Sequence, residues 1–384
     1  MDFSFSAEQE HIRETARRYA RDKLAPVYQQ RERDGDMPPA LFREMGELGF
    51  IGPALPEAYG GAGLDHVSVG IITEEIAYAD MNVAYIPMLH GLCASIVAQH
   101  AAPELARDVL PRLCAGEVVM ALALTEPQSG SDAAHARVKA VRDGNRWLLS
   151  GEKTSISFAD KAHYAITFAR TDPEVEGARG MSAFLVPLDA PGVTRTPFND
   201  LGSKIVGRGS LFFEDTPVPA EMMLGGEGKG FTQVMQGFDF SRALIGLQCL
   251  APARASLDET WRYVTERQAF GKPIAKYEGV SFPLAEGETQ VSAARLLCYQ
   301  TLWARDEGRP HTAEAAMVKW WAPKLAFDVI HRCLLAHGHG GYSDDFPHQQ
   351  RLRDVLGLQI GDGTAEIMKL IIAREKVGRV AVPY

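Results

Sequence analysis

The chain has 384 residues, of which 46% are hydrophobic, so it can bury a large core in two or three subdomains. A net charge of −9 without any basic run argues against nucleic acid and anionic membranes as partners. Its five cysteines are scattered and form no CxxC pair, which indicates reduced thiols in a reducing compartment. The first residues show no secretory signal pattern and no apolar run reaches membrane length, so we expect a cytoplasmic protein without a membrane span.

Residues 1–118 predict an N-terminal α-helical domain. Ser6 and Gln9 have capping-box spacing ahead of a first helix, and Asp65 precedes another run of apolar residues at helical spacing. The most apolar stretch, residues 83–98, is short and contains proline and glycine. We therefore interpret it as a buried helix.

Residues 119–229 predict a middle β domain. Asp143-Gly144 separates two short apolar runs, which is the pattern of a β-hairpin. Glycine and proline separate further short strands, which are expected at residues 164–168, 182–186 and 210–213. Such a segment predicts a β-barrel or β-sandwich.

Residues 230–384 predict a C-terminal α-helical domain. Residues 231–267 contain few helix breakers and predict one very long helix. Further helices are expected at residues 279–307, 312–337 and 364–378. Long helices joined by short loops favour an antiparallel four-helix bundle, so the predicted fold class is α+β multidomain in the order α, β, α.

Two motifs that suggest other functions are incomplete. The glycine-rich segment 225–230 lacks GxxxxGK[ST] spacing and no GxGxxG occurs, which argues against a nucleotide hydrolase and a Rossmann dehydrogenase. Cys333 and His337 lie four residues apart, near His331 and His339, but no carboxylate or further cysteine completes a ligand set. We expect no metal site.

Asp362 lies between two glycines, ahead of a helix for which Thr364 is a suitable N-cap, so its carboxylate is close to a positive helix end. It either only closes the turn or is held there for chemistry. A similar choice exists for Asp239 and Arg242, which form either a plain i,i+3 ion pair or part of a site. Arg267, at the end of the long predicted helix, interacts either with the helix dipole or with an anionic cofactor.

The order of several motifs resembles the acyl-CoA dehydrogenase family. The segments that carry this resemblance are Leu122–Pro127 with Ser129–Asp132, Glu214–Pro219, Leu224–Phe231, Arg267–Ile274, Ala315–Lys319, Gly340–Tyr342, Arg353-Asp354, Gly363–Ile367 and Ile372–Arg374. They cover nearly the whole chain and agree with the α, β, α division. The resemblance implies FAD as cofactor, an acyl-CoA substrate, an electron-transfer flavoprotein or similar acceptor, and a homotetramer built as a dimer of dimers.

The resemblance also implies roles for individual residues. Contacts to the isoalloxazine ring are implied for Leu122, Leu124, Thr125, Gly130, Ser131, Ser155 and Ser157. Contacts to the FAD of a neighbouring subunit are implied for Arg267, Phe270, Gly338 and His339, and further cofactor contacts for Thr364 and Glu366. Substrate contacts are implied for Ser131, Asp239, Arg242 and Gly363. Asp362 matches the catalytic base, which removes the α-proton while the β-hydrogen leaves as hydride to flavin N5.

The chain departs from the family pattern in ways that concern the substrate. Asp362 is one methylene shorter than the usual glutamate, and Ser155 replaces a usual tryptophan beside the flavin. These changes favour a cyclic or branched acyl group, such as that of cyclohexanecarboxyl-CoA. Two alternatives are a nitroalkane-oxidase-like flavoprotein, which also uses an aspartate, and a non-catalytic CoA-binding scaffold.

Overall fold

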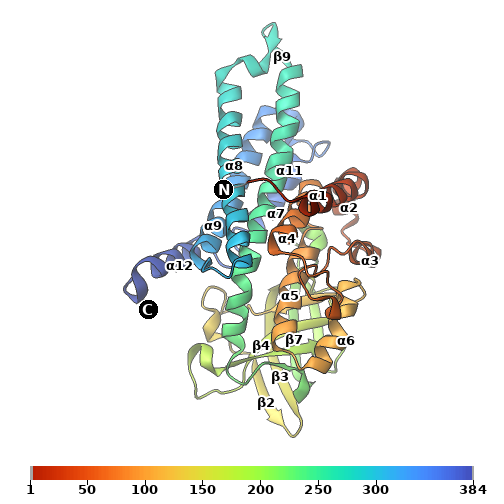
Figure 1. Ribbon diagram of the computed structural model, residues 1–384, viewed down its shortest axis with the longest axis vertical. Coiled ribbons are helices and arrows are strands. Elements are labelled where there is room, and N and C mark those ends of the chain that lie inside the picture. Colours follow the sequence, from red (N-terminus) through yellow and green to blue (C-terminus); the bar gives the residue numbers. More distant parts are fainter. Residues whose placement is uncertain (1–2, 383–384) are drawn as a thin grey trace.

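The computed structural model describes residues 3–382, without the side chains of residues 233–236, and divides into a helical, a β and a second helical part (Figure 1). The β strands form one end of the molecule, the long C-terminal helices form the other, and the N-terminal helices pack against the side of both (Figure 1). This arrangement confirms the predicted α, β, α fold class. No helix of the described chain is long and apolar enough to cross a bilayer.

The N-terminal part contains helices α1 (Ala7–Tyr19), α2 (Tyr28–Asp34), α3 (Pro39–Glu47), α4 (His66–Ala79), α5 (Tyr85–His100) and α6 (Pro103–Cys114). The predicted capping box begins α1, since Ser6 Oγ accepts from Gln9 N at 3.1 Å and Gln9 Oε1 accepts from Ser6 N at 3.0 Å. Asp65 caps α4 as expected. The buried His90 of α5 accepts from the backbone N–H of Met120 at 3.1 Å, which joins this helix to the first strand.

The middle part is an eight-stranded sheet with strand order β6-β7-β3-β2-β4-β5-β8, and β1 pairs with β4 in parallel. The predicted hairpin is β2 (Lys139–Asp143) with β3 (Arg146–Ile156), and the other predicted strands are β4 (Tyr164–Arg170), β5 (Met181–Pro187) and β7 (Gly209–Pro219). The sequence prediction missed β1 (Met120–Ala123), β6 (Val193–Pro197) and β8 (Met223–Leu224). β1 and β8 are short runs without an alternating pattern, and β6 is polar and ends in proline.

The C-terminal part contains α7 (Gly230–Glu266), α8 (Glu278–Asp306), α9 (Thr312–Ala336), α10 (His339–Tyr342), α11 (His348–Gly357) and α12 (Ala365–Val377). Helices α7, α8 and α9 pack on one another, and α4 packs on α7 and α8. A small ribbon, β9 (Gln268–Ala269) with β10 (Lys272–Pro273), closes the far end of the α7–α8 hairpin (Figure 1). Helix α12 packs along α9 and extends away from the body (Figure 1).

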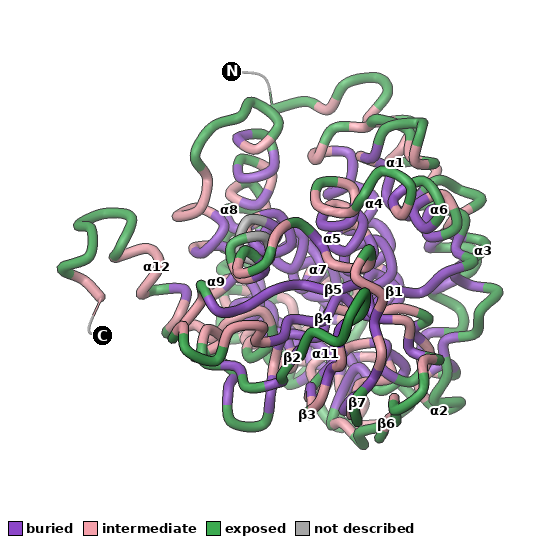
Figure 2. Tube along the Cα trace, turned by 90° about the horizontal axis from the view of Figure 1, so that it is seen from below, coloured by how far each residue is buried: buried purple, intermediate pink, exposed green. Residues whose placement is uncertain are grey.

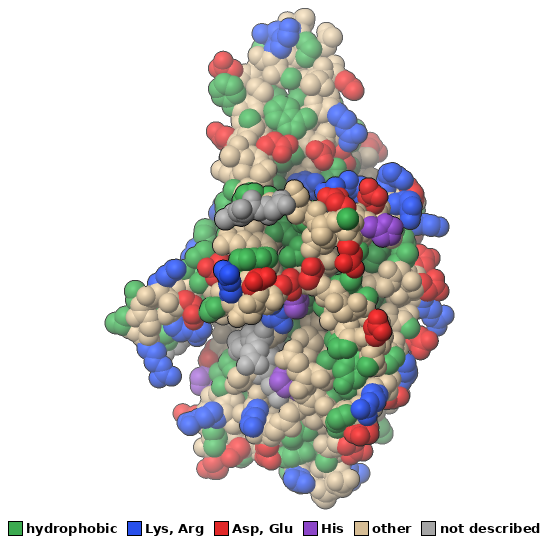
Figure 3. Space-filling model, viewed as in Figure 1, with side chains coloured by type: hydrophobic (Ala, Val, Ile, Leu, Met, Phe, Trp, Pro, Cys, Tyr) green, Lys and Arg blue, Asp and Glu red, His purple; other side chains and the backbone are tan. Residues whose placement is uncertain are grey.

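The three parts share one buried core. Buried residues gather around α7, β4 and β5, whereas the outer loops and the end of α12 are exposed (Figure 2). On the face drawn in Figure 3, acidic and basic side chains are interspersed, and no extended basic patch covers it. Such a surface offers no electrostatic footprint for a nucleic acid.

Asp354 of α11 joins all three parts. Its buried carboxylate accepts from Tyr28 Oη at 2.7 Å, from Asn82 Nδ2 at 2.9 Å and from the backbone N–H of Ser203 at 2.6 Å. Tyr28 and Asn82 belong to the N-terminal helical part, and Ser203 belongs to a loop of the β part. Because α11 leads directly into the segment with Asp362, this junction fixes where that segment begins.

Candidate active site

Asp362 lies in the short segment between α11 and α12 and is only partly exposed. Its φ is +56°, a left-handed conformation that aspartate adopts more readily than most residues but that still costs free energy. Thr364 caps α12 as predicted, because its Oγ1 accepts from Ile367 N at 3.4 Å. The carboxylate is therefore held by the backbone at a helix start.

Two cations influence Asp362. Burial raises the pKa of its carboxyl, and the positive charges of Lys319 and Arg242 oppose that shift. Lys319, on α9, is 1% exposed, and its Nζ donates to the carbonyl oxygens of Leu358 at 2.8 Å and Gly363 at 3.0 Å. A carboxyl group whose pKa is raised by burial is suited to general base catalysis.

The residues predicted to bind substrate on α7 form the expected ion pair. Arg242 Nη1 donates to Asp239 Oδ1 at 2.9 Å, and Thr312 Oγ1 donates to Asp239 Oδ2 at 2.6 Å. The pair also belongs to the candidate site, because the charge of Arg242 acts on Asp362. Arg242 Nε is buried and forms no hydrogen bond within the described chain.

A second group of predicted residues lies in the β part. Leu122 is on β1, and Leu124, Thr125, Gly130 and Ser131 follow in the next loop. The backbone N–H of Thr154 donates to the carbonyl oxygen of Thr125 at 2.9 Å, so this loop is attached to the end of β3. The predicted residues Ser155 and Ser157 follow on that same stretch.

A buried ion pair that the sequence prediction did not include shapes this loop. Lys153 Nζ donates to Glu126 Oε1 at 2.7 Å and to the carbonyl oxygen of Leu124 at 2.9 Å, and both charged side chains are at most 2% exposed. Glu126 also accepts from the backbone N–H groups of Arg137 at 2.6 Å and Val138 at 2.9 Å. A buried ion pair with these additional backbone hydrogen bonds fixes the loop conformation.

The loop and the end of β3 offer donors to a ligand. The hydroxyl groups of Thr125, Ser131, Ser155 and Ser157 form no hydrogen bond with another residue of the described chain. Ser155 is exposed and has a φ of +59° where the β3–β7 register shifts, so its side chain leaves the regular strand. Free hydroxyl groups on a fixed backbone fit the polar edge of a heterocycle such as isoalloxazine.

The remaining predicted cofactor residues lie at the other end of the bundle. Arg267 follows the end of α7, about seven turns and about 38 Å beyond Arg242 along the helix. Phe270, in the turn between β9 and β10, is 96% exposed with a φ of +50°. Gly338 and His339 follow the end of α9, which runs towards the same tip. One chain therefore does not bring these four residues to Asp362.

His337, one of the residues considered as metal ligands, has structural partners. The ring of His337 stacks on Tyr263 at a centroid distance of 4.2 Å, and its Nδ1 lies 2.8 Å from the carbonyl oxygen of Cys333. Within residues 3–382, no group of three or more His, Cys, Asp or Glu residues is arranged to hold a metal ion.

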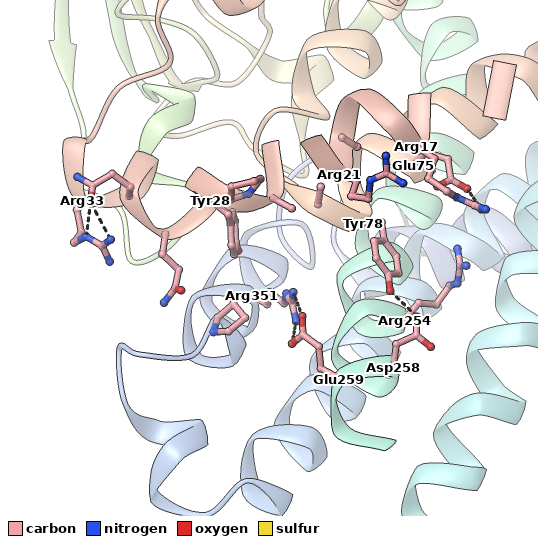
Figure 4. A pocket seen from close by; sticks show the side chains of 17 residues that line it. Arg17, Arg21, Tyr28, Arg33, Glu75, Tyr78, Arg254, Asp258, Glu259 and Arg351 are labelled. Carbon is pink, nitrogen blue, oxygen red and sulfur yellow. Dashed lines mark hydrogen bonds and ion pairs between the residues drawn. The ribbon is translucent and has the colours of Figure 1, made fainter. Parts of the chain in front are cut away.

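A separate cavity of about 600 Å³ lies between the N-terminal helices and the bundle (Figure 4). Its walls are rich in arginine, but Arg351 pairs with Glu259 at 2.7 Å and Arg17 pairs with Glu75 at 2.7 Å (Figure 4). None of the predicted site residues lines it. Arg21 pairs with Asp22 and Arg254 with Glu74 as well, whereas Arg33 donates to the neutral Gln30.

Two lysines, Lys153 and Lys319, are the main site features missed from the sequence. Lys319 stands in an otherwise uncharged stretch, after Ala315–Val318, whereas Lys153 on β3 directly follows Glu152. A lysine among small or apolar residues was the available signal, because lysine is almost never fully buried unless it has partners. Its partners could not be read from the sequence, since they lie in distant segments.

Comparison with known proteins agrees with this geometry. Models of the acyl-CoA dehydrogenase N-terminal, middle and C-terminal domains match residues 6–117, 121–216 and 228–377. The probable acyl-CoA dehydrogenase YngJ of Bacillus subtilis is 34% identical over 378 residues, which cover 98% of this chain and 99% of that protein. Butyryl-CoA dehydrogenase of Megasphaera elsdenii superposes with a TM-score of 0.95 at 33% identity, covering 98% of this chain and 100% of that one. A structure described as the electron transferring flavoprotein of Acidaminococcus fermentans gives a TM-score of 0.95 at 32% identity, with 98% and 100% covered.

The fold, the buried carboxylate and the hydroxyl-lined loops define a flavin-dependent oxidoreductase. More particularly, the chain belongs to the acyl-CoA dehydrogenase family. It is an enzyme that dehydrogenates an acyl-CoA thioester with FAD as its cofactor.

Proposed function

We propose that Asp362 is the general base that removes the α-proton of the acyl-CoA thioester. The observation that carries this proposal is a carboxyl group held at a φ of +56° beside two cations, with a pKa raised by burial. The raised pKa favours proton abstraction, and the positive charges of Lys319 and Arg242 oppose that rise. FAD, when bound, supplies the acceptor for the β-hydrogen, which leaves as hydride.

The same segment offers donors to the thioester oxygen. The backbone N–H groups of Asp362 and Gly363 donate to no other residue of the described chain. Charge that develops on the carbonyl oxygen during α-proton removal needs such fixed donors. We assign Gly363 to the substrate for this reason.

The other substrate residues hold the CoA part in this proposal. Arg242 supplies the positive charge, and Asp239 fixes the guanidinium through their ion pair. Ser131 is exposed and carries a free hydroxyl.

The cofactor residues divide into two sets. The chain's own FAD is held by the loop after β1, the end of β3, and Thr364 with Glu366 at the start of α12. Arg267, Phe270, Gly338 and His339 contact the FAD of a neighbouring subunit in a homotetramer. The almost complete exposure of Phe270 and the 85% exposure of Val380 support apolar contacts between subunits.

The acyl group and the electron acceptor are proposed from finer features. The short side chain of Asp362 and the serine at Ser155 favour a cyclic or branched acyl group, such as cyclohexanecarboxyl, although one solved relative is a butyryl-CoA dehydrogenase. An electron-transfer flavoprotein in the cytoplasm is the proposed acceptor, and similarity to a structure described by that name supports it.

Anaerobic mixing of the purified holoenzyme with a substrate panel tests the proposal. The panel contains butyryl-, glutaryl- and cyclohexanecarboxyl-CoA and a nitroalkane, and bleaching of the visible flavin band is followed. We expect thioesters to bleach the flavin, with cyclohexanecarboxyl-CoA fastest. Bleaching by the nitroalkane alone would support a nitroalkane-oxidase-like function, and protein purified without a flavin band would support a CoA-binding scaffold.

A further inference from the structure

Lys319 connects the two ends of the segment that carries Asp362. Its Nζ donates to the carbonyl oxygen of Leu358, just after α11, at 2.8 Å and to that of Gly363, just before α12, at 3.0 Å. The segment between these carbonyls contains only Gln359 to Asp362. One ammonium group therefore fixes the distance between the two ends of the loop.

The ammonium of Lys319 also forms no ion pair within the described chain. Its hydrogen bonds go to two neutral carbonyl groups, and no carboxylate of the described chain forms an ion pair with it. A buried charge without an ion-pair partner is costly, so it persists only where its field or its hydrogen bonds are needed. Among the neighbouring charges, Asp362 has the largest influence on Lys319, and Lys319 has the largest influence on Asp362.

We propose that Lys319 is a positioning residue that holds the Asp362 loop in its bent conformation and places a positive charge beside the Asp362 carboxyl. This inference rests on the proposed role of Asp362 as the base. The carbonyl contacts set the direction of the carboxylate, and the ammonium charge sets the pH range in which it can accept a proton.

Other charged and titratable groups also act on the Asp362 carboxyl, and variants of Lys319 leave these groups unchanged. Arg242 acts on Asp362 from α7, and Arg374 of α12 acts on Arg242. Tyr85 of α5 interacts with Asp362 and has its Oη 3.5 Å from Arg208 Nη1 of the β part. Burial lowers the pKa of Lys319 to about 8, so its ammonium is present in the range where Asp362 works.

The sign of the effect follows from charge. Removing the ammonium removes a positive charge that opposes the upward shift of the Asp362 pKa. The carboxyl of a neutral variant therefore becomes protonated at higher pH than in the parent. Flavin reduction needs the ionised base. As pH falls, the neutral variant should therefore lose its reduction rate at a higher pH than the parent does.

The test compares Lys319→Met with Lys319→Arg and with Lys324→Met as the matched control. Lys324 is on the same helix, but it is exposed and pairs only with Asp328 at 2.6 Å. Two readouts are measured on each holoenzyme: the pH profile of anaerobic flavin reduction by butyryl-CoA, and the titration of the Asp362 carboxyl by carbon-13 NMR, assigned with Asp362→Asn. The second readout does not depend on turnover.

We expect Lys319→Met to move both midpoints to higher pH and to reduce the rate at pH 7 about a hundredfold, since a displaced base loses its alignment. Lys319→Arg retains the charge, so its midpoints stay near those of the parent while its rate falls through crowding. Lys324→Met behaves as the parent does. Unchanged midpoints in a folded, flavin-loaded Lys319→Met protein overturn the proposal.

Two further variants keep the outcome decisive. Lys319→Gln is the second neutral variant if Lys319→Met does not fold, and the same upward shift is expected. If neither neutral variant folds, displaced midpoints in Lys319→Arg overturn the proposal, and retained midpoints support it. Asp362→Ala separates failure of the Lys319 proposal from failure of the proposed function. Reduction at the parent rate in that variant contradicts the role of Asp362 as the base.

Discussion

Two buried lysines each hold a loop of the active site, but only one of them has an ion-pair partner. Lys153 is neutralised by Glu126 at 2.7 Å, whereas Lys319 donates only to carbonyl oxygens. Burial lowers the pKa of both to about 8, against the opposing influence of a carboxylate in each case. A neutralised pair shapes a loop without projecting charge, while an uncompensated ammonium shapes a loop and also acts on Asp362. The difference suggests that the first loop serves hydrogen bonding to a cofactor and the second serves proton transfer.

The largest effect on the rate of flavin reduction is expected at Asp362, beside Lys319. Asp362→Ala removes the proposed base and leaves the loop held by Lys153 untouched. Anaerobic flavin reduction by an acyl-CoA should slow by about a thousandfold or more, while the FAD content stays that of the parent. Parent-like reduction would remove Asp362 from the mechanism, and loss of FAD would assign the residue to cofactor binding.

The next largest effect concerns the neutralised lysine. Lys153→Met leaves the carboxylate of Glu126 buried and unpaired, which should destabilise the protein by about 3–5 kcal/mol and lower its FAD content. Lys161→Met is the control, because Lys161 pairs with Asp160 at 2.8 Å in the same β part and both side chains are partly exposed. That change should cost about 0–1 kcal/mol. Urea unfolding measures both, and equal losses would contradict the distinction between the pairs.

A smaller effect is expected on the free energy of unfolding, because the buried carboxylate of Asp362 destabilises the folded protein at neutral pH. Because burial raises the folded-state pKa of Asp362, its contribution to stability is most favourable below its unfolded pKa and is lost as pH rises through the folded value. Asp362→Asn should therefore stabilise the protein at neutral pH, by about 0.5–2 kcal/mol, and this gain should vanish in acid. Asparagine also tolerates the left-handed backbone. Melting temperatures over a pH series test this, and a destabilised variant at neutral pH would show that the ionised carboxylate is favourable.

Elements with local signals were predictable from the sequence. The capping box at Ser6, the Asp143-Gly144 hairpin and the long helix α7 depend on residues within a few positions of one another. Strand β1 forms by pairing with β4, for example Met120 with Tyr164, and no local sequence pattern predicts it. Helix α11 was missed because it buries polar side chains, such as His348 and Asp354, beside distant elements.

The site divides in the same way. Asp362 stands out locally, as an acid between two glycines at a helix start, and the order of the family motifs gives it a role. The carbonyl oxygens bound by Lys153 and Lys319 lie 29 to 44 residues away in the sequence. Such pairings arise only when the chain has folded, so neither lysine could be given a role from spacing.

Exchange of the substrate α-proton tests the central claim most directly, because it isolates the base from the hydride step. The holoenzyme is incubated in D₂O with 3,3-dimethylbutyryl-CoA, a thioester that has α-protons but no β-hydrogen to transfer. Proton NMR should show loss of the α-proton signal with the parent enzyme and its persistence with flavin-loaded Asp362→Ala. Exchange at the parent rate in that variant would contradict the assignment of Asp362 as the base.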